Sequence, residues 1–146
     1  MELVIFIGLQ GCGKSAFYKE RFFRTHVRIN LDMLRTRHRE RMIFEVCLRA
    51  GQPMVIDNTN PAPADRARYI PAARAAGFRV AGYWFESTIE ECRARNEQRE
   101  GKAAVPLAAL RATAARLRPP SPDEGFDELW DVRIAFGGGF TVARGF

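Results

Sequence analysis

The sequence predicts an α/β fold: a single-domain protein with a mostly parallel sheet of about five strands, flanked by helices. Two observations carry this prediction. The chain of 146 residues is long enough to bury one core and too short for two domains. Short apolar runs also alternate with longer segments of helical periodicity, which is typical of parallel strands joined by helical crossovers. We therefore expect residues 1–146 to form one domain.

The first expected strand covers residues 3–7, where the run LVIFI is apolar throughout. A strand with one solvated face alternates apolar and polar residues, whereas a strand buried on both faces of a parallel sheet does not. This run therefore indicates a central strand. Further apolar runs predict strands over residues 27–30, 54–57, 80–85 and 132–134.

Helical periodicity fills the intervals between these strands. Gly51 and Gly77 each follow a periodic segment and predict its C-terminal end. Ser87, with Glu90 three residues later, predicts a capping box at the start of another helix. The expected helices cover residues 15–23, 39–50, 63–76, a segment that begins at 87, and 106–117. Residues 118–125 and the tail 137–146 look loop-like, and the tail has no assigned role.

The segment that follows the first strand, GLQGCGKS at residues 8–15, fits the phosphate-binding pattern G-x-x-x-x-G-K-[ST]. Its glycines let successive N–H groups point inward at a polyphosphate. Lys14 supplies a positive charge for the β- and γ-phosphates, and the Ser15 hydroxyl suits a Mg²⁺ ligand. The sequence therefore predicts a site for ATP or another nucleoside triphosphate with Mg²⁺. The expected nucleotide-binding residues in this segment are Gly8, Gly11, Cys12, Gly13, Lys14, Ser15 and Ala16.

Composition narrows the classes of partner. The net charge of +6 and the pI near 9.8 suit a polyanion such as nucleic acid, although the arginine-rich composition of a GC-rich genome explains the same excess. No stretch approaches the roughly 20 apolar residues of a membrane span, so no membrane association is expected. The short apolar start also differs from a signal peptide. The oligomeric state stays open, a homodimer included.

The three cysteines, Cys12, Cys47 and Cys92, lack the spacing of a metal site or of a redox pair. They predict reduced thiols in a cytoplasmic protein. Cys12 lies beside a lysine and a helix N-terminus, and both features favour a reactive thiolate. The alternative is a Cys12 side chain that points into the core and is inert.

Residues near the end of the second expected strand are candidates for acceptor chemistry. Because open α/β sheets bind ligands at the carboxyl ends of their strands, the carboxylate of Asp32 can face the γ-phosphate and accept a proton from an attacking hydroxyl. Arg35, one helical turn later, could hold an anionic part of the acceptor. The alternative is that Asp32 only caps a helix and Arg35 is solvated. The basic segment 35–41 is either a groove for a nucleic acid strand or a solvated helix face.

The third expected strand ends in DNTN, residues 57–60. Asp57 stands where phosphate-loop proteins place the acid that orients the Mg²⁺ shell, whereas an Asx turn before Pro61 is the ordinary alternative. We expect Asn58 and Asn60, with Asp32 and Arg35, to contact the substrate.

A run of arginines predicts a lid over about residues 93–105. Arg95 and Arg99 lie on a helix that leads into Gly101, an arrangement that suits a mobile clamp on transferring phosphoryl oxygens. We expect both side chains to bind the nucleotide. A solvated charged face is the competing interpretation.

Together these segments resemble the 5′-hydroxyl polynucleotide kinase family over nearly the whole chain. VIDNTNP and the following RARYIPAARAAG are similar to the kinase domain of animal polynucleotide kinase-phosphatase. RNEQREGKAAVPLAALRA is similar to the lid of the phage enzyme, and EGFDELWDV to the family's closing strand. The resemblance implies transfer of the γ-phosphate of ATP or another NTP, with Mg²⁺, to the 5′-OH end of DNA or RNA.

The resemblance also implies roles for individual residues. Asp32 matches the family's general base for the 5′-hydroxyl. Arg35 matches the arginine that grips the phosphate next to the acceptor nucleotide, and Arg99 matches the lid arginine that contacts the donor phosphate. Animal relatives carry a D-x-D-x-[TV] phosphatase motif that this sequence lacks, so no 3′-phosphatase activity is expected.

Two departures from the family pattern stand out. Leu31 replaces the arginine that usually precedes the base. The phage enzyme has its essential acid at the position of Asn58, one residue after Asp57, which leaves the duty of Asp57 open. Two other functions stay open as well: a kinase for a nucleoside, sugar or antibiotic hydroxyl, and a regulatory NTPase that transfers phosphate only to water. The missing N-K-x-D signature argues against the commonest switches of the latter class.

Overall fold

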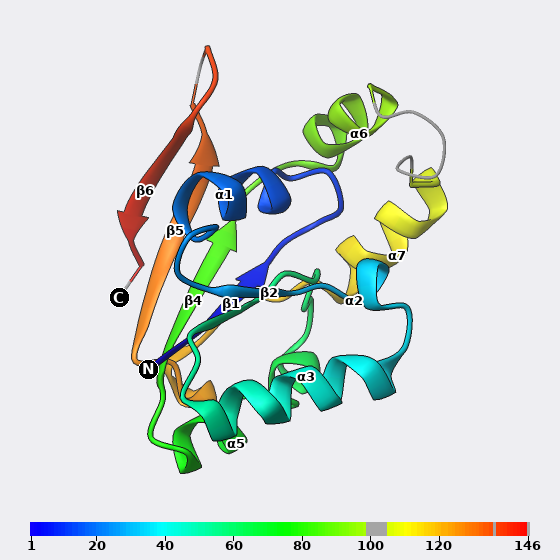
Figure 1. Ribbon diagram of the computed structural model, residues 1–146. Helices are drawn as coiled ribbons and strands as arrows, with labels where there is room; N and C mark the ends of the chain where they lie inside the picture. Colours follow the sequence, from blue (N-terminus) through cyan, green and yellow to red (C-terminus); the bar gives the residue numbers. More distant parts are fainter. Residues whose placement is uncertain (99–104, 136, 146) are drawn as a thin grey trace.

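The computed structural model describes residues 1–98, 105–135 and 137–145, which form a six-stranded sheet with helices on both faces (Figure 1). The strands lie in the order β2-β3-β1-β4-β5-β6, and the first five are parallel. Their bounds are β1 (Glu2–Ile7), β2 (Val27–Ile29), β3 (Met54–Ile56), β4 (Arg79–Phe85), β5 (Glu128–Ile134) and β6 (Phe140–Arg144). The predicted α/β class with a mostly parallel sheet is confirmed.

Seven helices in the described ranges connect these strands. They are α1 (Lys14–Arg21), α2 (Leu31–Leu34), α3 (Arg37–Ala50), α4 (Pro63–Arg66), α5 (Ile70–Ala75), α6 (Ile89–Glu97) and α7 (Leu107–Arg116), with a 3₁₀ turn η2 (Pro122–Glu124). Gly51 ends α3 in the left-handed conformation, as the sequence predicts. None of the helices in the described part of the chain is long and apolar enough to cross a membrane.

Strand β1 contributes alternate residues to two cores on opposite faces of the sheet, and all five residues of its LVIFI run are fully buried. One core packs the sheet against α3 and α5 and includes Leu3, Ile5, Ile7, Phe44 and Ile70. The other packs it against α1, α6 and α7 and includes Val4, Phe6, Phe17, Cys92 and Leu110. Because both faces are covered, the strand has no polar alternation, which explains the uninterrupted apolar run.

The structure corrects the expected tail. We expected about five strands and a loop-like tail over residues 137–146, but residues 140–144 form the sixth strand. This strand, β6, pairs with β5 in the antiparallel direction. Gly137, Gly138 and Gly139 all have positive φ, so they supply the reversal between the two strands, which most other residues could supply only with strain.

Two helix boundaries also differ from expectation. The single helix expected over residues 63–76 is two helices, α4 and α5. Pro71 has no N–H for a bond to the carbonyl one turn earlier, so the chain cannot continue as one regular helix there. Helix α6 is capped by Thr88, whose hydroxyl accepts from the N–H of Glu91 at 3.1 Å. The cap predicted at Ser87 with Glu90 is therefore one residue too early.

Candidate active site

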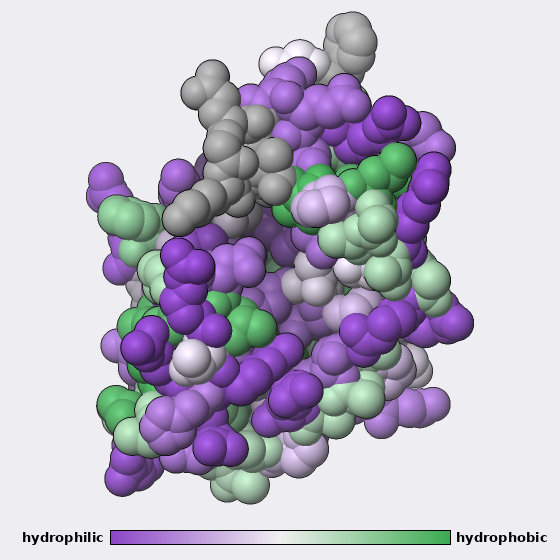
Figure 2. All heavy atoms as spheres, turned by 90° about the vertical axis from the view of Figure 1, so that its right-hand side faces the viewer, coloured by the Kyte–Doolittle hydropathy of each residue, from purple (hydrophilic) through white to green (hydrophobic). Residues whose placement is uncertain are grey.

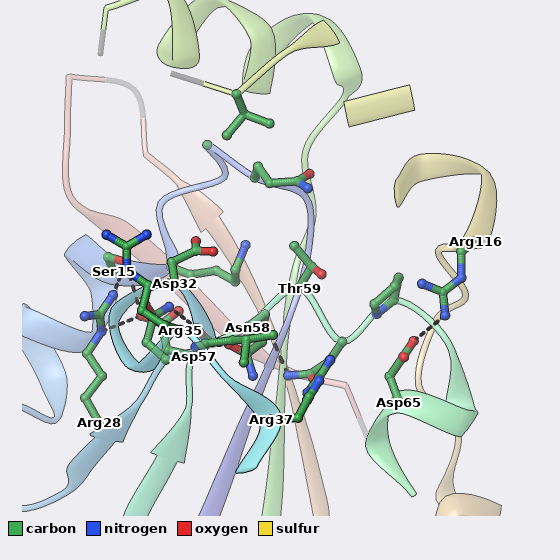
Figure 3. A pocket seen from close by; sticks show the side chains of 18 residues that line it. Ser15, Arg28, Asp32, Arg35, Arg37, Asp57, Asn58, Thr59, Asp65 and Arg116 are labelled. Atoms are coloured by element: carbon green, nitrogen blue, oxygen red, sulfur yellow. Dashed lines mark hydrogen bonds and ion pairs between the residues drawn. The ribbon is translucent and has the colours of Figure 1, made fainter. Parts of the chain in front are cut away.

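A pocket of about 1040 Å³ opens at the carboxyl edge of the sheet, among the segments that follow β1, β2 and β3 (Figure 3). Figure 2 shows it as a hollow in a mostly hydrophilic face. A volume of this order accommodates a nucleotide together with part of a second substrate. The charged side chains among its described lining residues are Lys14, Arg28, Asp32, Arg35, Arg37, Asp57, Asp65 and Arg116.

The phosphate loop forms one end of the pocket and leads directly into α1. Gly13 precedes the helix with φ 94°, and no side chain caps the helix there. Gly11 has φ 79°, and at both positions a side chain would strain the backbone. Gly8 anchors the start of the loop by donating its N–H to the carbonyl of Thr59 at 3.0 Å. The uncapped first turn of α1 therefore leaves backbone N–H groups for a phosphate, as the motif predicts.

The ammonium of Lys14 binds carbonyl groups of the phosphate loop. Its Nζ donates to the carbonyls of Gly8 at 3.0 Å and Leu9 at 2.7 Å, and lies 3.5 Å from the sulfur of Cys12. The side chain is buried, so an incoming polyphosphate must compete with these loop carbonyls for the ammonium. Ala16 is exposed in the first turn of α1, and its methyl group has no polar atom to offer a phosphate.

Ser15 is part of a three-membered cluster with an acid and an arginine. Its hydroxyl donates to Asp57 Oδ2 at 3.1 Å. Arg28 donates from Nε to the same oxygen at 2.8 Å and from Nη2 to Ser15 Oγ at 2.9 Å. Sequence reasoning missed Arg28, although an arginine between two apolar residues of a short expected strand was the available signal.

Ser15 and Asp57 could hold a Mg²⁺ ion that binds with a nucleotide. Mg²⁺ usually takes one or two protein oxygens and completes its shell with phosphate oxygens and water. A hydroxyl and a carboxylate 3.1 Å apart fit that donor set. Within the described ranges, no group of three or more His, Cys, Asp or Glu side chains could hold a metal by itself.

Asp32 projects from α2 and lines the pocket next to the phosphate loop (Figure 3). It is not the helix cap, because Asn30 holds that position and its Oδ1 accepts from the N–H of Met33 at 2.9 Å. Within the part of the chain that the structure describes, no hydrogen bond or ion pair engages the Asp32 carboxylate. The capping alternative for Asp32 is therefore wrong, and the carboxylate is open to the pocket.

Arg35 ends the same short helix in an unusual conformation. Its φ is 78°, in the left-handed region that a residue with a long side chain rarely adopts. Its N–H donates to the carbonyl of Leu31 at 2.7 Å, which closes the turn. The turn places Arg35 and Asp32 together on the lining of the pocket. Backbone strain of this kind persists where surrounding structure enforces it, and it clusters at functional sites.

A buried carboxylate, Glu40 on α3, holds the segment that bears Asp32. Asn58 links the two: its Oδ1 accepts from the N–H of Leu31 at 2.8 Å, and its Nδ2 donates to Glu40 Oε2 at 2.9 Å. The hydroxyl of Tyr69 donates to Glu40 Oε1 at 2.7 Å. Burial, together with Glu40, raises the pKa of Tyr69 well above its usual range, so the hydroxyl stays a donor. Sequence reasoning missed Glu40, which lies within the basic segment 35–41.

Asn60 is buried, and its Nδ2 donates to the carbonyl of Phe6 at 2.8 Å. Asn58 and Asn60 both line the pocket, but their amides are engaged within the protein. In this structure they brace the wall of the pocket, and the substrate contacts expected of them stay a prediction.

Of the expected lid, the structure describes residues 93–98, which belong to α6 and its C-terminal cap, and Val105, which lies shortly before α7. Arg95 donates from Nη1 to the carbonyl of Gly11 at 3.4 Å, so α6 contacts the phosphate loop. Asn96 joins the two sides of the expected lid, because its Oδ1 accepts from the N–H of Val105 at 2.8 Å. Arg99 and residues 100–104 lie outside the described residues, and the role of Arg99 stays a prediction.

The cysteines are buried, which favours the inert alternative for Cys12. Cys12 is 1% exposed and Cys92 is fully buried. Burial, with the neighbouring Cys12, raises the pKa of Cys92 to about 11. The Cys92 thiol therefore stays protonated at neutral pH and reacts slowly, because the thiolate is the nucleophile. In the phosphate loop, Cys12 offers a nucleotide only its backbone.

We therefore expect all three thiols of the native, nucleotide-free protein to resist maleimide at neutral pH. The denatured protein, in which the thiols are solvated, should label quickly and serves as the control. Mass spectrometry of labelled peptides would measure the modification at each cysteine. Rapid native labelling of Cys12 that is slowed by a nucleotide would instead support the reactive thiolate.

The chain is similar in sequence to a protein family and to two curated proteins. Residues 3–120 match a family model described as AAA domain. The chain is 26% identical over 135 residues to a bifunctional polynucleotide phosphatase/kinase of Schizosaccharomyces pombe, covering 90% of this chain and 33% of the relative. It is 29% identical over 142 residues to a protein of Acanthamoeba polyphaga mimivirus named for the same two activities, covering 92% of this chain and 34% of that protein.

The chain thus spans about a third of the length of the curated relatives it matches. The names of these relatives confirm the resemblance to polynucleotide kinases. Among solved structures, a sugar kinase from Janibacter sp. HTCC2649 superposes with a TM-score of 0.65 at 20% identity, covering 90% of this chain and 85% of that one. At that identity the likeness concerns the fold.

Proposed function

We propose that this chain, which belongs to the AAA domain family, is a phosphate-loop kinase that transfers the γ-phosphate of ATP or another NTP to the 5′-OH end of DNA or RNA. One observation carries the proposal. An open carboxylate, Asp32, lines the same pocket as the phosphate loop and as Arg35. A base placed beside a phosphate-binding loop is what phosphoryl transfer to a hydroxyl requires. The curated relatives that match about nine tenths of this chain are named bifunctional polynucleotide phosphatase/kinases.

The reaction divides among residues of the pocket. Loop N–H groups and Lys14 bind the donor phosphates, while Ser15 and Asp57 would hold the Mg²⁺ that neutralises charge on them. Arg35 binds the acceptor phosphate nearest the 5′ end. The oxygen of the 5′-hydroxyl attacks the γ-phosphorus in line with the departing NDP, and Asp32 accepts the proton of that hydroxyl. Positioning and charge stabilisation supply most of the rate enhancement in such transfers.

Arg99, and Arg95 with it, would stabilise charge on the transferring phosphoryl group. The support for Arg99 is its match to the family's lid arginine. The support for Arg95 is its contact with the carbonyl of Gly11, which places its helix against the phosphate loop.

Transfer of labelled γ-phosphate to different acceptors tests the proposed function directly. DNA and RNA oligonucleotides with 5′-OH ends should be labelled, and the same oligonucleotides with 5′-phosphate ends should not. Efficient labelling of a free nucleoside or a sugar, but not of an oligonucleotide, would instead establish the small-molecule kinase. Hydrolysis that no hydroxyl acceptor changes would establish the NTPase.

Binding of a 5′-OH oligonucleotide should weaken with salt, and more steeply for longer strands. Each single-strand phosphate that the protein neutralises contributes a slope of about −0.7 in log K against log salt. Arg35, Arg37 and Arg116 are exposed at the pocket, so strands of several nucleotides should engage more of them than a dinucleotide does. Fluorescence anisotropy at several salt concentrations would measure the slopes. Equal slopes for short and long strands would contradict a nucleic acid groove.

A further inference from the structure

We propose that Arg28 is a tethered cation that competes with the divalent metal for Ser15 and Asp57, and that it withdraws when a metal–nucleotide binds. Its guanidinium engages Ser15 Oγ at 2.9 Å and Asp57 Oδ2 at 2.8 Å. These are the two oxygens that suit Mg²⁺ in this pocket. The inference rests on the nucleotide-binding half of the proposed function and is independent of the acceptor.

The charge balance of the cluster supports competition. The Asp57 side chain is 1% exposed and already has one full positive charge beside it. A buried carboxylate in such an ion pair attracts a second cation much less than an unpaired carboxylate does, because the two cations repel each other at short range. A free divalent ion therefore gains little at this site while Arg28 is in place.

The second contact of Arg28 distinguishes this cluster from an ordinary ion pair. An arginine that served only to neutralise Asp57 would need no contact with the phosphate loop. Here Nη2 donates to the hydroxyl of Ser15, the hydroxyl that the loop motif assigns to the metal. Lys14 is likewise engaged by loop carbonyls. The hydroxyl that the motif assigns to the metal and the ammonium that it assigns to the phosphates are therefore both engaged by groups of the protein itself.

Arg28 also has room to withdraw. Its side chain is 26% exposed and lines the pocket. Its guanidinium carbon lies 6.0 Å from the centre of the Tyr18 ring, near the outer limit of a cation–π contact, so this contact resists withdrawal only weakly. When a nucleotide brings its metal, negative phosphate oxygens enter the same pocket and can receive the displaced guanidinium. Entry of the metal is thereby coupled to entry of the nucleotide.

Mn²⁺ binding to the nucleotide-free protein, measured by electron paramagnetic resonance, tests the proposal. The wild type should bind Mn²⁺ weakly, and Arg28→Met should bind it about tenfold more tightly, because removing a neighbouring charge restores the attraction of Asp57. Arg28→Gln should behave like Arg28→Met, since it retains hydrogen bonding without the charge. Arg24→Met is the matched control: Arg24 is exposed in the turn before β2, and its loss should leave Mn²⁺ affinity unchanged.

Thermal unfolding supplies a second readout. Arg28→Met leaves Asp57 buried without its counterion, so the variant should melt at a lower temperature. Mg²⁺ should restore part of that loss and should raise the melting temperature of the variant more than that of the wild type or Arg24→Met. NaCl at matched ionic strength controls for screening. Both measurements omit the acceptor, so a failed transfer assay and a failed metal test are distinguishable.

The proposal is overturned if Arg28→Met and Arg28→Gln bind Mn²⁺ no more tightly than the wild type. Weaker binding would show that Arg28 orients Asp57 for the metal. If Arg28→Met bound Mn²⁺ more tightly but Arg28→Gln bound it with wild-type affinity, hydrogen bonding rather than charge would govern the site. An Arg28→Met protein whose melting temperature is the same with and without Mg²⁺ would also contradict the proposal.

Discussion

Asp32→Asn should reduce phosphoryl transfer to a 5′-hydroxyl by roughly 10²-fold or more, the usual range for removal of a general base. The substitution keeps the size and polarity of the side chain while removing the proton acceptor. Asn30 caps α2, so the helix should be unaffected. Affinity for Mg²⁺–NTP should change little, because the phosphate loop, Lys14 and Ser15 carry it. Initial rates with labelled γ-phosphate, together with titration of a fluorescent NTP analogue, measure the two effects separately.

Asp65→Asn is a matched control for this prediction. Asp65 is another carboxylate of the pocket lining, but it pairs with Arg116 at 2.9 Å, at the side away from Ser15 and Asp57 (Figure 3). Its loss removes the same charge from the same pocket and should cost far less in rate. Near wild-type transfer by Asp32→Asn would reject Asp32 as the base. Lys14→Ala should differ from both by weakening nucleotide binding as well as transfer.

Arg66→Met should lower the free energy of unfolding by about 3–5 kcal/mol, the range for breaking a buried ion pair on one side. Arg66 is fully buried. It donates from Nη1 to both carboxylate oxygens of Glu124, at 3.0 and 2.9 Å. The remaining guanidinium N–H groups donate to the carbonyls of Asn60, Pro61 and Arg118. Methionine would leave the carboxylate and three carbonyls without these donors.

Denaturant unfolding monitored by circular dichroism would measure this loss. Arg66→Lys should recover little, because an ammonium cannot reproduce the planar fork that serves five acceptor oxygens. Arg74→Met is the matched control, since Arg74 also pairs with an acid, Asp127 at 3.0 Å, but is half exposed. Its loss should cost about 1 kcal/mol or less. An Arg66→Met protein as stable as Arg74→Met would show that the buried cluster contributes nothing.

The Arg66 cluster also matters for the site. Arg66 holds the carbonyls of Asn60 and Pro61, which line the pocket, and that of Arg118, which follows α7. A destabilised variant should therefore show weaker nucleotide and acceptor binding at temperatures where the global fold persists.

Sequence patterns were sufficient wherever the physical cause is local. The apolar run at residues 3–7 identifies a strand covered on both faces, because every residue of it must avoid water. The phosphate loop can be identified from the sequence because its glycines, lysine and serine act within one short segment. Helix ends at Gly51 and near Gly77 follow from backbone conformations that glycine adopts without strain. The break in the helix expected over residues 63–76 also has a local cause, because Pro71 lacks an N–H, so the sequence contained the signal for it.

The pairing of charged side chains was decided only by the tertiary structure. Arg28, Ser15 and Asp57 come from three separate segments and meet because the order β2-β3-β1 brings their ends together. The contact of Arg66 with Glu124 likewise spans 58 positions. A charged residue in a sequence has no intrinsic partner, because solvent, a helix terminus and a distant acid all satisfy it. The sequence alone thus determined the α/β class and the phosphate loop. Packing decides that Asp57 and Asp65 are paired and that Asp32, among the carboxylates of the described pocket lining, is open to the pocket, because this outcome depends on distances between segments that only the folded sheet sets.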